Sequence, residues 1–266
     1  MMYLSSVLLS SLLSFWVIHP AFSFAPRPTP VVLAQRHQKS FSPSTAKTAK
    51  TTRTSTKTST TTLAFFDKVF EEEGPLGKGI TIGKVQVALF TTDRSRDSIF
   101  GAVKRAVDEH AGVSTNYDLA CLAQEVCLAL LRRKDSWTAA SSESKWFKED
   151  DSGKAESLFN DWANREAVKF EKEYPATITG DKDEAGFATA VVVSIILELV
   201  GDQTRFAGAG LSLAQTEDVL QSIASDAMVE DGDCVNAVEV FWTPGESTEV
   251  LSSRDLIVDF PELITI

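Results

Sequence analysis

AVVVSIIL, residues 190–197, is a nearly continuous apolar run in which β-branched side chains predominate. It lies within residues 186–200 and lacks the strict alternation of apolar and polar residues that marks a strand with one solvated face. Such a run is typical of a central strand that is covered on both faces. Residues 186–200 are therefore predicted to form the middle of a sheet enclosed by other elements.

Two further segments have the composition of strands. Residues 80–91 place Ile82, Val85 and Val87 among polar neighbours, and no proline interrupts them. Residues 234–243 are rich in valine and aromatic residues and end at a Pro-Gly pair. At least three strands are therefore expected.

Apolar residues spaced by three and four positions predict the helices. These helices span residues 96–111, 116–134, 153–174 and 215–229, with a short helical turn after Ser252 and Ser253 that runs to about residue 258. Residues 136–151 are expected to form a loop or a short extended piece anchored by two tryptophans. The predicted fold class is α+β, a small β-sheet of three or more strands covered by four to five helices in the order β-α-α-α-β-α-β.

The first 64 residues contain no Asp or Glu. Residues 1–23 have the apolar run and small terminal residues of a signal peptide, and residues 24–64 have the basic, Ser/Thr-rich composition of a transit peptide. Together they resemble the bipartite presequence of plastid proteins in algae with secondary plastids. The predicted location is therefore the plastid, in the stroma or at the stromal face of the thylakoid or envelope. A secreted protein with an O-glycosylated Thr-rich stalk is the alternative interpretation.

Residues 65–79 are predicted to be a linker, and residues 80–266 a single globular domain. The whole chain carries 26 basic and 37 acidic residues, a formal net charge of −11. This acidity argues against a nucleic-acid partner and against unaided binding to anionic lipid. The longest apolar run of the domain is too short to cross a bilayer, so no transmembrane helix is expected in the mature chain.

Histidine and cysteine chemistry is sparse. Only His110 lies beyond the leader, which excludes a zinc site with several histidines. We expect His110 to be half-buried near the end of its helix. Cys121, Cys127 and Cys234 form no CxxC pair and are expected to be free thiols, with a disulfide between Cys234 and one of the two helical cysteines as the alternative. The sequence predicts no catalytic residue, no cofactor and no metal ligand.

Two hypotheses for function remain open. In the first, the chain is a regulator or adaptor whose interaction surface includes Trp137, Trp146, Trp242 and Pro244, since tryptophan is enriched at contact hot spots. Core packing is the alternative role for each tryptophan.

In the second hypothesis, the chain is an enzyme or a small-ligand-binding domain that uses carboxylates. The candidate groups are Asp93, Glu125, Glu198 and Glu239, with Arg94 or Arg132. Glu125 and Glu239 lie in apolar segments, where burial raises the pKa of a carboxyl group and favours acid–base chemistry. Exposed faces of a helix and a strand are the simpler explanation.

Several motifs together resemble a known family. They are VQVAL at 85–89, LACLAQEVCLALLR at 119–132, SW at 136–137 with ASS at 140–142, AVEVFWTP at 237–244, and the ending from LSS at 251–253 to DFPEL at 259–263. This set is similar to a domain family of unknown biochemical function in cyanobacteria and plastids, whose land-plant member is the fluctuating-light acclimation protein of the chloroplast.

The resemblance implies a part in photosynthetic acclimation, through thermal energy dissipation and plastid proton or ion balance. The adaptor hypothesis, motivated by the lack of a metal-ligand cluster and of a nucleotide fingerprint, predicts a thylakoid or plastid-envelope membrane protein as partner. A chaperone-like assembly factor is a further alternative. Many members carry a Gly/Arg-rich segment and a membrane helix before the domain. Residues 65–79 supply neither, so this chain is expected to be soluble.

Overall fold

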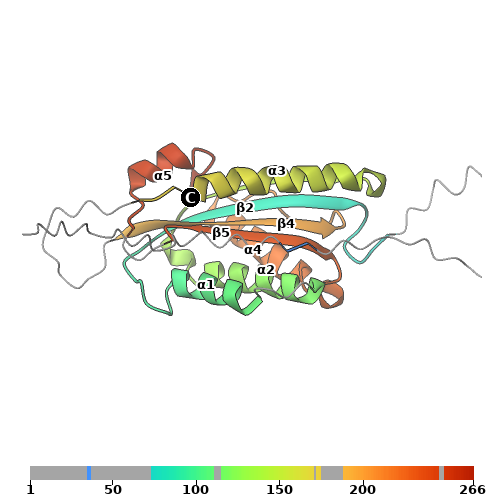
Figure 1. The fold of residues 1–266 in the computed structure, drawn as a ribbon, viewed down its shortest axis with the longest axis horizontal. Helices are drawn as coiled ribbons and strands as arrows, with labels where there is room; N and C mark the ends of the chain where they lie inside the picture. Colours follow the sequence, from blue (N-terminus) through green and yellow to red (C-terminus); the bar gives the residue numbers. More distant parts are fainter. Residues whose placement is uncertain (1–34, 37–72, 111–114, 171, 175–187, 246–248) are drawn as a thin grey trace, which may run out of the picture.

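The computed structural model describes residues 35–36, 73–110, 115–170, 172–174, 188–245 and 249–266 (Figure 1). The expected leader, apart from residues 35–36, and the first part of the expected linker, residues 65–72, lie outside the described residues. Within the linker, residues 73–79 make a tight turn in which Gly74 and Gly77 exchange backbone hydrogen bonds. Leu76 is buried, so this turn packs against the domain.

The centre of the fold is an antiparallel sheet with the strand order β1-β5-β4-β2-β3-β6. Its long strands are β2 (Ile80–Thr91), β3 (Trp137–Phe147), β4 (Thr189–Val200) and β5 (Val235–Thr243), and its short edge strands are β1 (Gln35–Arg36) and β6 (Ile264–Thr265). β2 and β4 are paired along their whole lengths. The strand predicted from the AVVVSIIL run is therefore central, as expected.

Helices cover both faces of the sheet (Figure 1). α1 (Ile99–His110), α2 (Asn116–Leu131) and α4 (Leu213–Asp226) lie on one face, and α3 (Ser152–Phe170) and α5 (Ser253–Asp259) lie on the other. Three short 3₁₀ turns are η2 (Lys134–Ser136), η3 (Glu149–Asp151) and η4 (Val229–Gly232). The α+β class is confirmed, and the sheet is larger than the minimum predicted.

β3 occupies most of residues 136–151, for which a loop or a short extended piece was predicted. The segment is extended, but it is a full strand of 11 residues that pairs with β2 from Phe147 opposite Ile80 to Ala139 opposite Ala88. The predicted order β-α-α-α-β-α-β lacks this strand. The segment between the tryptophans contains alanine, serine, glutamate and lysine and therefore has little intrinsic strand propensity. Pairing with β2 stabilises the extended conformation that its composition does not favour.

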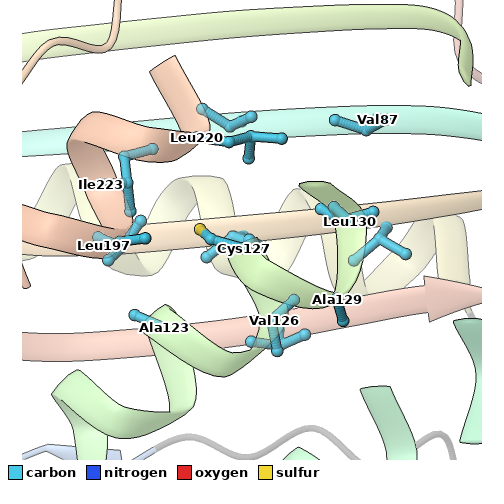
Figure 2. Close-up of a cluster of buried hydrophobic side chains, with 14 of the residues drawn as sticks. Val87, Ala123, Val126, Cys127, Ala129, Leu130, Leu197, Leu220 and Ile223 are labelled. Carbon is cyan, nitrogen blue, oxygen red and sulfur yellow. The ribbon is translucent and has the colours of Figure 1, made fainter. Parts of the chain in front are cut away.

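The sheet separates two hydrophobic cores. Odd-numbered residues of β4, from Val191 to Leu199, face α1, α2 and α4, and Ala190, Val192 and Ile196 face α3 and α5. Figure 2 shows the first core, where α2 presents Ala123 and Cys127 towards the sheet and towards α4. The run of β4 is apolar at nearly every residue because each of its faces is covered.

A close approach between a ring and the sheet explains one glycine. Phe206, which is 2% exposed, lies over Gly83 of β2. A Cβ atom at Gly83 would lie 2.0 Å from Cε1 of Phe206. Glycine is therefore needed at residue 83 of β2, so that the loop between β4 and α4 can place the Phe206 ring on the sheet.

Candidate functional site

Two of the four predicted interaction residues are buried. Trp137 is 7% exposed, and its Nε1 donates a hydrogen bond to the carbonyl oxygen of Leu130 at 3.2 Å. Pro244 is also buried, after a cis peptide bond that follows Thr243. Trp137 therefore has the core-packing role, and neither residue offers a contact surface.

Trp146 is exposed and held in one orientation. Its side chain is on the molecular surface at 43% exposure, and its Nε1 donates a hydrogen bond to the carbonyl oxygen of Lys78 at 2.7 Å. The ring lies against Gly79, where an added Cβ atom would be 2.8 Å from Cε2 of Trp146. An oriented, exposed tryptophan has the properties of a contact hot spot, because little side-chain entropy is lost on binding.

Trp242 is half-buried against the core formed with α1, α2 and α4. Trp146 is opposite Thr81 at one end of β2, and Trp242 is opposite Val193, which pairs with Val87 near the other end. Strand spacing and rise place the two tryptophans roughly 25 Å apart. The predicted residues therefore do not form one surface.

The candidate carboxylates lie in three separate places. Asp93 is exposed in the turn after β2, where the backbone N–H of Ser95 donates to it and lowers its pKa. Arg94, beside it, donates to the carbonyl oxygen of Glu249 at 2.6 Å, and burial lowers the pKa of Arg94. Arg132 is exposed at the end of α2.

Glu125 lies on α2 beside His110. The His110 side chain is 10% exposed, with Nε2 at 3.6 Å from the Glu125 carboxylate and Nδ1 at 3.8 Å from Asp118. Both acidic side chains come from α2, two turns apart, and His110 is the last residue of α1. The arrangement links the end of α1 to α2.

Glu198 and Glu239 come together on the α3 face of the sheet. Glu198 is opposite Ala237, and Glu239 is opposite Ile196, so the two glutamates are diagonal neighbours with Cα atoms about 7–8 Å apart. They are 7% and 6% exposed. Glu239 is therefore a buried carboxyl group in an apolar strand, and the simpler explanation, an exposed strand face, is wrong for this residue.

A β-bulge shapes this carboxylate pair. Between Glu198 and Leu199 the register shifts, and the extra residue on β5 is Asn236. Its Nδ2 donates to Oε1 of Glu198 at 3.2 Å. Oε2 of Glu239 is buried with no hydrogen-bond partner among the described residues, and burial raises the pKa of Glu239 to about 7.

A buried ion network on the same face was not predicted from the sequence. Glu166 of α3 is 1% exposed and accepts hydrogen bonds from Nε2 of Gln86 at 2.7 Å and from Nζ of Lys84 at 3.3 Å. Lys169 reaches Glu166 at 3.3 Å and Glu262 at 2.5 Å. These contacts connect α3 to β2 and to the chain after α5.

The charges of this network stabilise one another. Burial acts against the charged form of Lys169, but the Glu262 hydrogen bond and the Glu166 charge raise its pKa. Burial likewise opposes the ionised form of Glu262, whose pKa is lowered by the Lys169 hydrogen bond and charge. Gln86 also accepts from the Ser141 hydroxyl at 3.1 Å, so every long side chain at the centre of the network is paired.

The sequence feature that could have indicated this network is the alternation of polar and apolar residues in β2. Lys84 and Gln86 occupy the positions between its apolar residues, a pattern that normally indicates a solvated face. α3 covers that face, and Glu166 on its inner side meets the two polar side chains. Lys84 and Gln86 therefore need a polar partner on the face that α3 covers, and only the tertiary structure identifies that partner as Glu166.

Neither a metal centre nor a membrane-spanning helix is found among the described residues. No group of three or more His, Cys, Asp or Glu side chains in the described part is arranged to hold a metal ion. Over the same residues, no helix has both the length and the hydropathy to cross a lipid bilayer.

Comparison with known proteins identifies the family. The family described as "Protein of unknown function (DUF1517)" matches residues 79–266. The chain belongs to this family. The DUF1517 match covers every element from β2 to β6 and includes Trp146, the carboxylate pair and the buried network.

The chain is also similar to a cyanobacterial protein. Protein FLAP1 homolog A of the cyanobacterium Synechocystis sp. (strain ATCC 27184 / PCC 6803 / Kazusa) is 29% identical over 204 residues, which are 69% of this chain and 56% of the relative. The chain thus spans just over half of that protein's length. The resemblance to the fluctuating-light acclimation family is confirmed. No solved structure matches the chain.

Proposed function

We propose that this chain is a plastid-targeted, non-enzymatic adaptor in light acclimation, and that it docks on a thylakoid or envelope membrane protein through Trp146. The observation that carries the proposal is the orientation of the exposed Trp146 ring by Lys78 and Gly79. The name of the Synechocystis relative supports the acclimation role. Energy dissipation and plastid proton or ion balance are the processes in which the adaptor acts.

The buried network supports the same proposal. Glu166 is fully enclosed and paired with Lys84 and Gln86, so it ties α3 to the sheet and is not offered to a substrate. Buried and satisfied polar groups of this kind specify and rigidify a fold. A rigid domain with an oriented aromatic side chain is well suited to binding another protein.

Affinity capture tests the adaptor. The full chain, tagged at its C-terminus, is expressed in an alga with a secondary plastid, briefly cross-linked in intact plastids and captured for mass spectrometry. We expect enrichment of one thylakoid or envelope membrane protein, with at least a tenfold loss in Trp146→Ala. Tyr117→Ala, which truncates another exposed aromatic residue on α2, is the matched control and retains the partner.

Recovery of bait alone, or equal capture by Trp146→Ala, contradicts docking through this residue. Circular dichroism of both variants checks that the fold is intact. Targeting has its own test, in which residues 1–64 are fused to a fluorescent protein. Plastid fluorescence supports the targeting part of the proposal, and secretion into the medium refutes it.

A second candidate function rests on Glu198 and Glu239. A carboxyl group with a pKa of about 7 next to a second carboxylate is suited to proton transfer or to binding a small polar ligand. A thermal-shift screen of plastid metabolites tests it. A ligand that raises the melting temperature of the wild type but not of Glu239→Gln favours this candidate, and equal shifts in both proteins exclude the pair as its site.

A further inference from the structure

We propose that the open edge of β3 pairs with the same edge of a second copy of this chain, giving a two-fold symmetric dimer with one continuous sheet. β6 pairs only with Ala139 and Ala140 of β3. Beyond these residues, from Ser141 to Phe147, β3 has β2 on one side and no strand on the other within the described part of the chain. This inference is independent of the adaptor proposal.

The backbone of the open segment is directed outward at alternate residues. The N–H of Ile266 donates to the carbonyl oxygen of Thr138 at 3.1 Å, so the backbone polar groups of Thr138 are directed away from β2, towards β6. Regular alternation then directs the N–H and C=O groups of Ser142, Ser144 and Trp146 away from β2. A row of unpaired groups at a sheet edge is a template for another strand.

The length of the open segment selects one register. Ser144 is the middle residue of the seven from Ser141 to Phe147. Antiparallel pairing of two copies with Ser144 opposite the partner's Ser144 uses the whole segment and stops where β6 begins. Ser142 is then opposite the partner's Trp146, and both residues have the outward backbone groups that a hydrogen-bonded pair requires.

The charges select the same register. Glu143 is opposite the partner's Lys145, and Lys145 is opposite the partner's Glu143, as non-hydrogen-bonded pairs with Cα atoms about 4.5 Å apart. Opposite charges directly across a strand pair stabilise it, and like charges destabilise it. A register centred on Glu143 or on Lys145 places two like charges opposite each other, and these alternatives are disfavoured.

Both charged side chains are available for the partner. The Glu143 side chain is 60% exposed and lies 3.8 Å from Nζ of Lys84, and Lys145 is exposed with its ammonium 5.2 Å from the Phe147 ring. In the dimer, Glu143 lies between Lys84 of its own chain and the partner's Lys145. This self-complementary pattern favours a second copy over an unrelated strand, because one surface supplies both members of each pair.

The charged pairs and Trp146 lie on opposite faces of the sheet. Glu143 and Lys145 are on the α3 face, whereas Trp146 alternates to the opposite face, where it contacts Lys78. Substitutions at residues 143 and 145 therefore test the dimer without altering the Trp146 ring. Failure of the dimer and failure of the adaptor proposal are distinguishable for this reason.

Charge reversal tests the proposal. Sedimentation of the purified full chain is expected to show a dimer at tens of micromolar, and Glu143→Lys and Lys145→Glu each weaken it at least tenfold. A one-to-one mixture of the two single variants restores dimers. The Glu143→Lys variant has lysine at residues 143 and 145, and the Lys145→Glu variant has glutamate at both, so each lysine is opposite a glutamate in the heterodimer. The double variant, E143K with K145E, also restores the dimer. Native mass spectrometry identifies the heterodimer by its mass.

Two further variants complete the experiment. Glu149→Lys makes the same charge change just outside the segment and leaves the dimer intact. Ser144→Pro removes an N–H group that is directed away from β2 and makes no hydrogen bond to it. This substitution abolishes the dimer, and the melting temperature of the monomer is retained. A monomeric wild type at 100 micromolar overturns the proposal. So does a mixture of the single variants that stays monomeric while both are folded.

Discussion

The carboxylate of Glu166 lies 3.3 Å from the ammonium of Lys84, in the layer between α3 and β2. The side chains are 1% and 13% exposed, so neither charge has ready access to water. Gln86 completes the hydrogen bonding of Glu166 at 2.7 Å. Removing Glu166 leaves the largely buried Lys84 with only the exposed Glu143 carboxylate, at 3.8 Å.

Glu166→Gln is therefore expected to lower the free energy of unfolding by about 3 kcal/mol, since breaking a buried pair typically costs 3–5 kcal/mol. Urea denaturation followed by tryptophan fluorescence measures the loss. Asp161→Asn, on the exposed side of the same helix, breaks the 2.8 Å pair with Arg165 and should change stability by about 0.5 kcal/mol or less. Equal effects of the two substitutions contradict a stabilising role for the buried network.

Glu239 predicts a dependence of stability on pH. Burial raises its pKa from 4.5 to about 7 in the folded chain, so the folded state keeps a proton that the unfolded state has lost. The stability associated with that proton is complete below about pH 4.5 and declines as pH rises to about 7. Glu239→Gln should therefore stabilise the protein at pH 8, by of order 1–3 kcal/mol, and much less at pH 5.

Denaturant titrations at pH 5, 6, 7 and 8 measure this difference. Glu109→Gln, on the exposed side of α1, is the control and should leave the pH profile of stability unchanged. A gain from Glu239→Gln that is the same at pH 5 and pH 8 is inconsistent with a titrating Glu239.

Gly83 predicts a packing defect. A Cβ atom at this position would lie 2.0 Å from the Phe206 ring, so Gly83→Ala should destabilise the protein by about 1–3 kcal/mol. Phe206→Leu in the Gly83→Ala background should recover part of the loss, which a double-mutant cycle measures. Gly153→Ala is the matched control, because no atom lies within 4 Å of the added methyl group. Additive effects at residues 83 and 206 would show that the ring and the glycine do not interact.

Thiol labelling should separate the three cysteines. Cys127 is 0% exposed, and burial raises the pKa of its thiol to about 12. Cys234 is 3% exposed, whereas Cys121 is half-buried. Labelling with a disulfide reagent at pH 8 should therefore modify one thiol in the folded chain and three after denaturation. Cys121→Ser should abolish the fast reaction, and a fast reaction that persists would assign it to a buried thiol.

The elements with the strongest sequence patterns were predicted well. The bounds predicted for β2 match the structure, and β4 begins three residues later than expected. The helix expected over residues 116–134 ends at Leu131, because η2 follows it. A long periodic pattern of apolar residues predicts helices and strands of this kind, because the apolar positions are those that the fold buries.

β3 and the buried network could not be predicted in the same way. The Ser-rich segment of β3 is extended because β2 pairs with it, and pairing partners are not encoded in local composition. Glu166 was one of many charges on a helix predicted to face water, and Lys84 and Gln86 occupied the polar positions of a strand. Only the packing of α3 on that face of the sheet shows that these three residues meet.

The pairing of β2 with β4 also has a consequence for synthesis. The two strands are neighbours along twelve residues each, yet their paired residues are separated by about a hundred positions in the chain. Contacts of such long range are slow to form, because a large loop must close before they stabilise anything. A chain that emerges N-terminus first exposes the apolar faces of β2 and α2 until residues 189–200 arrive. The newly made protein therefore depends on chaperones during that interval more than its folded stability would indicate.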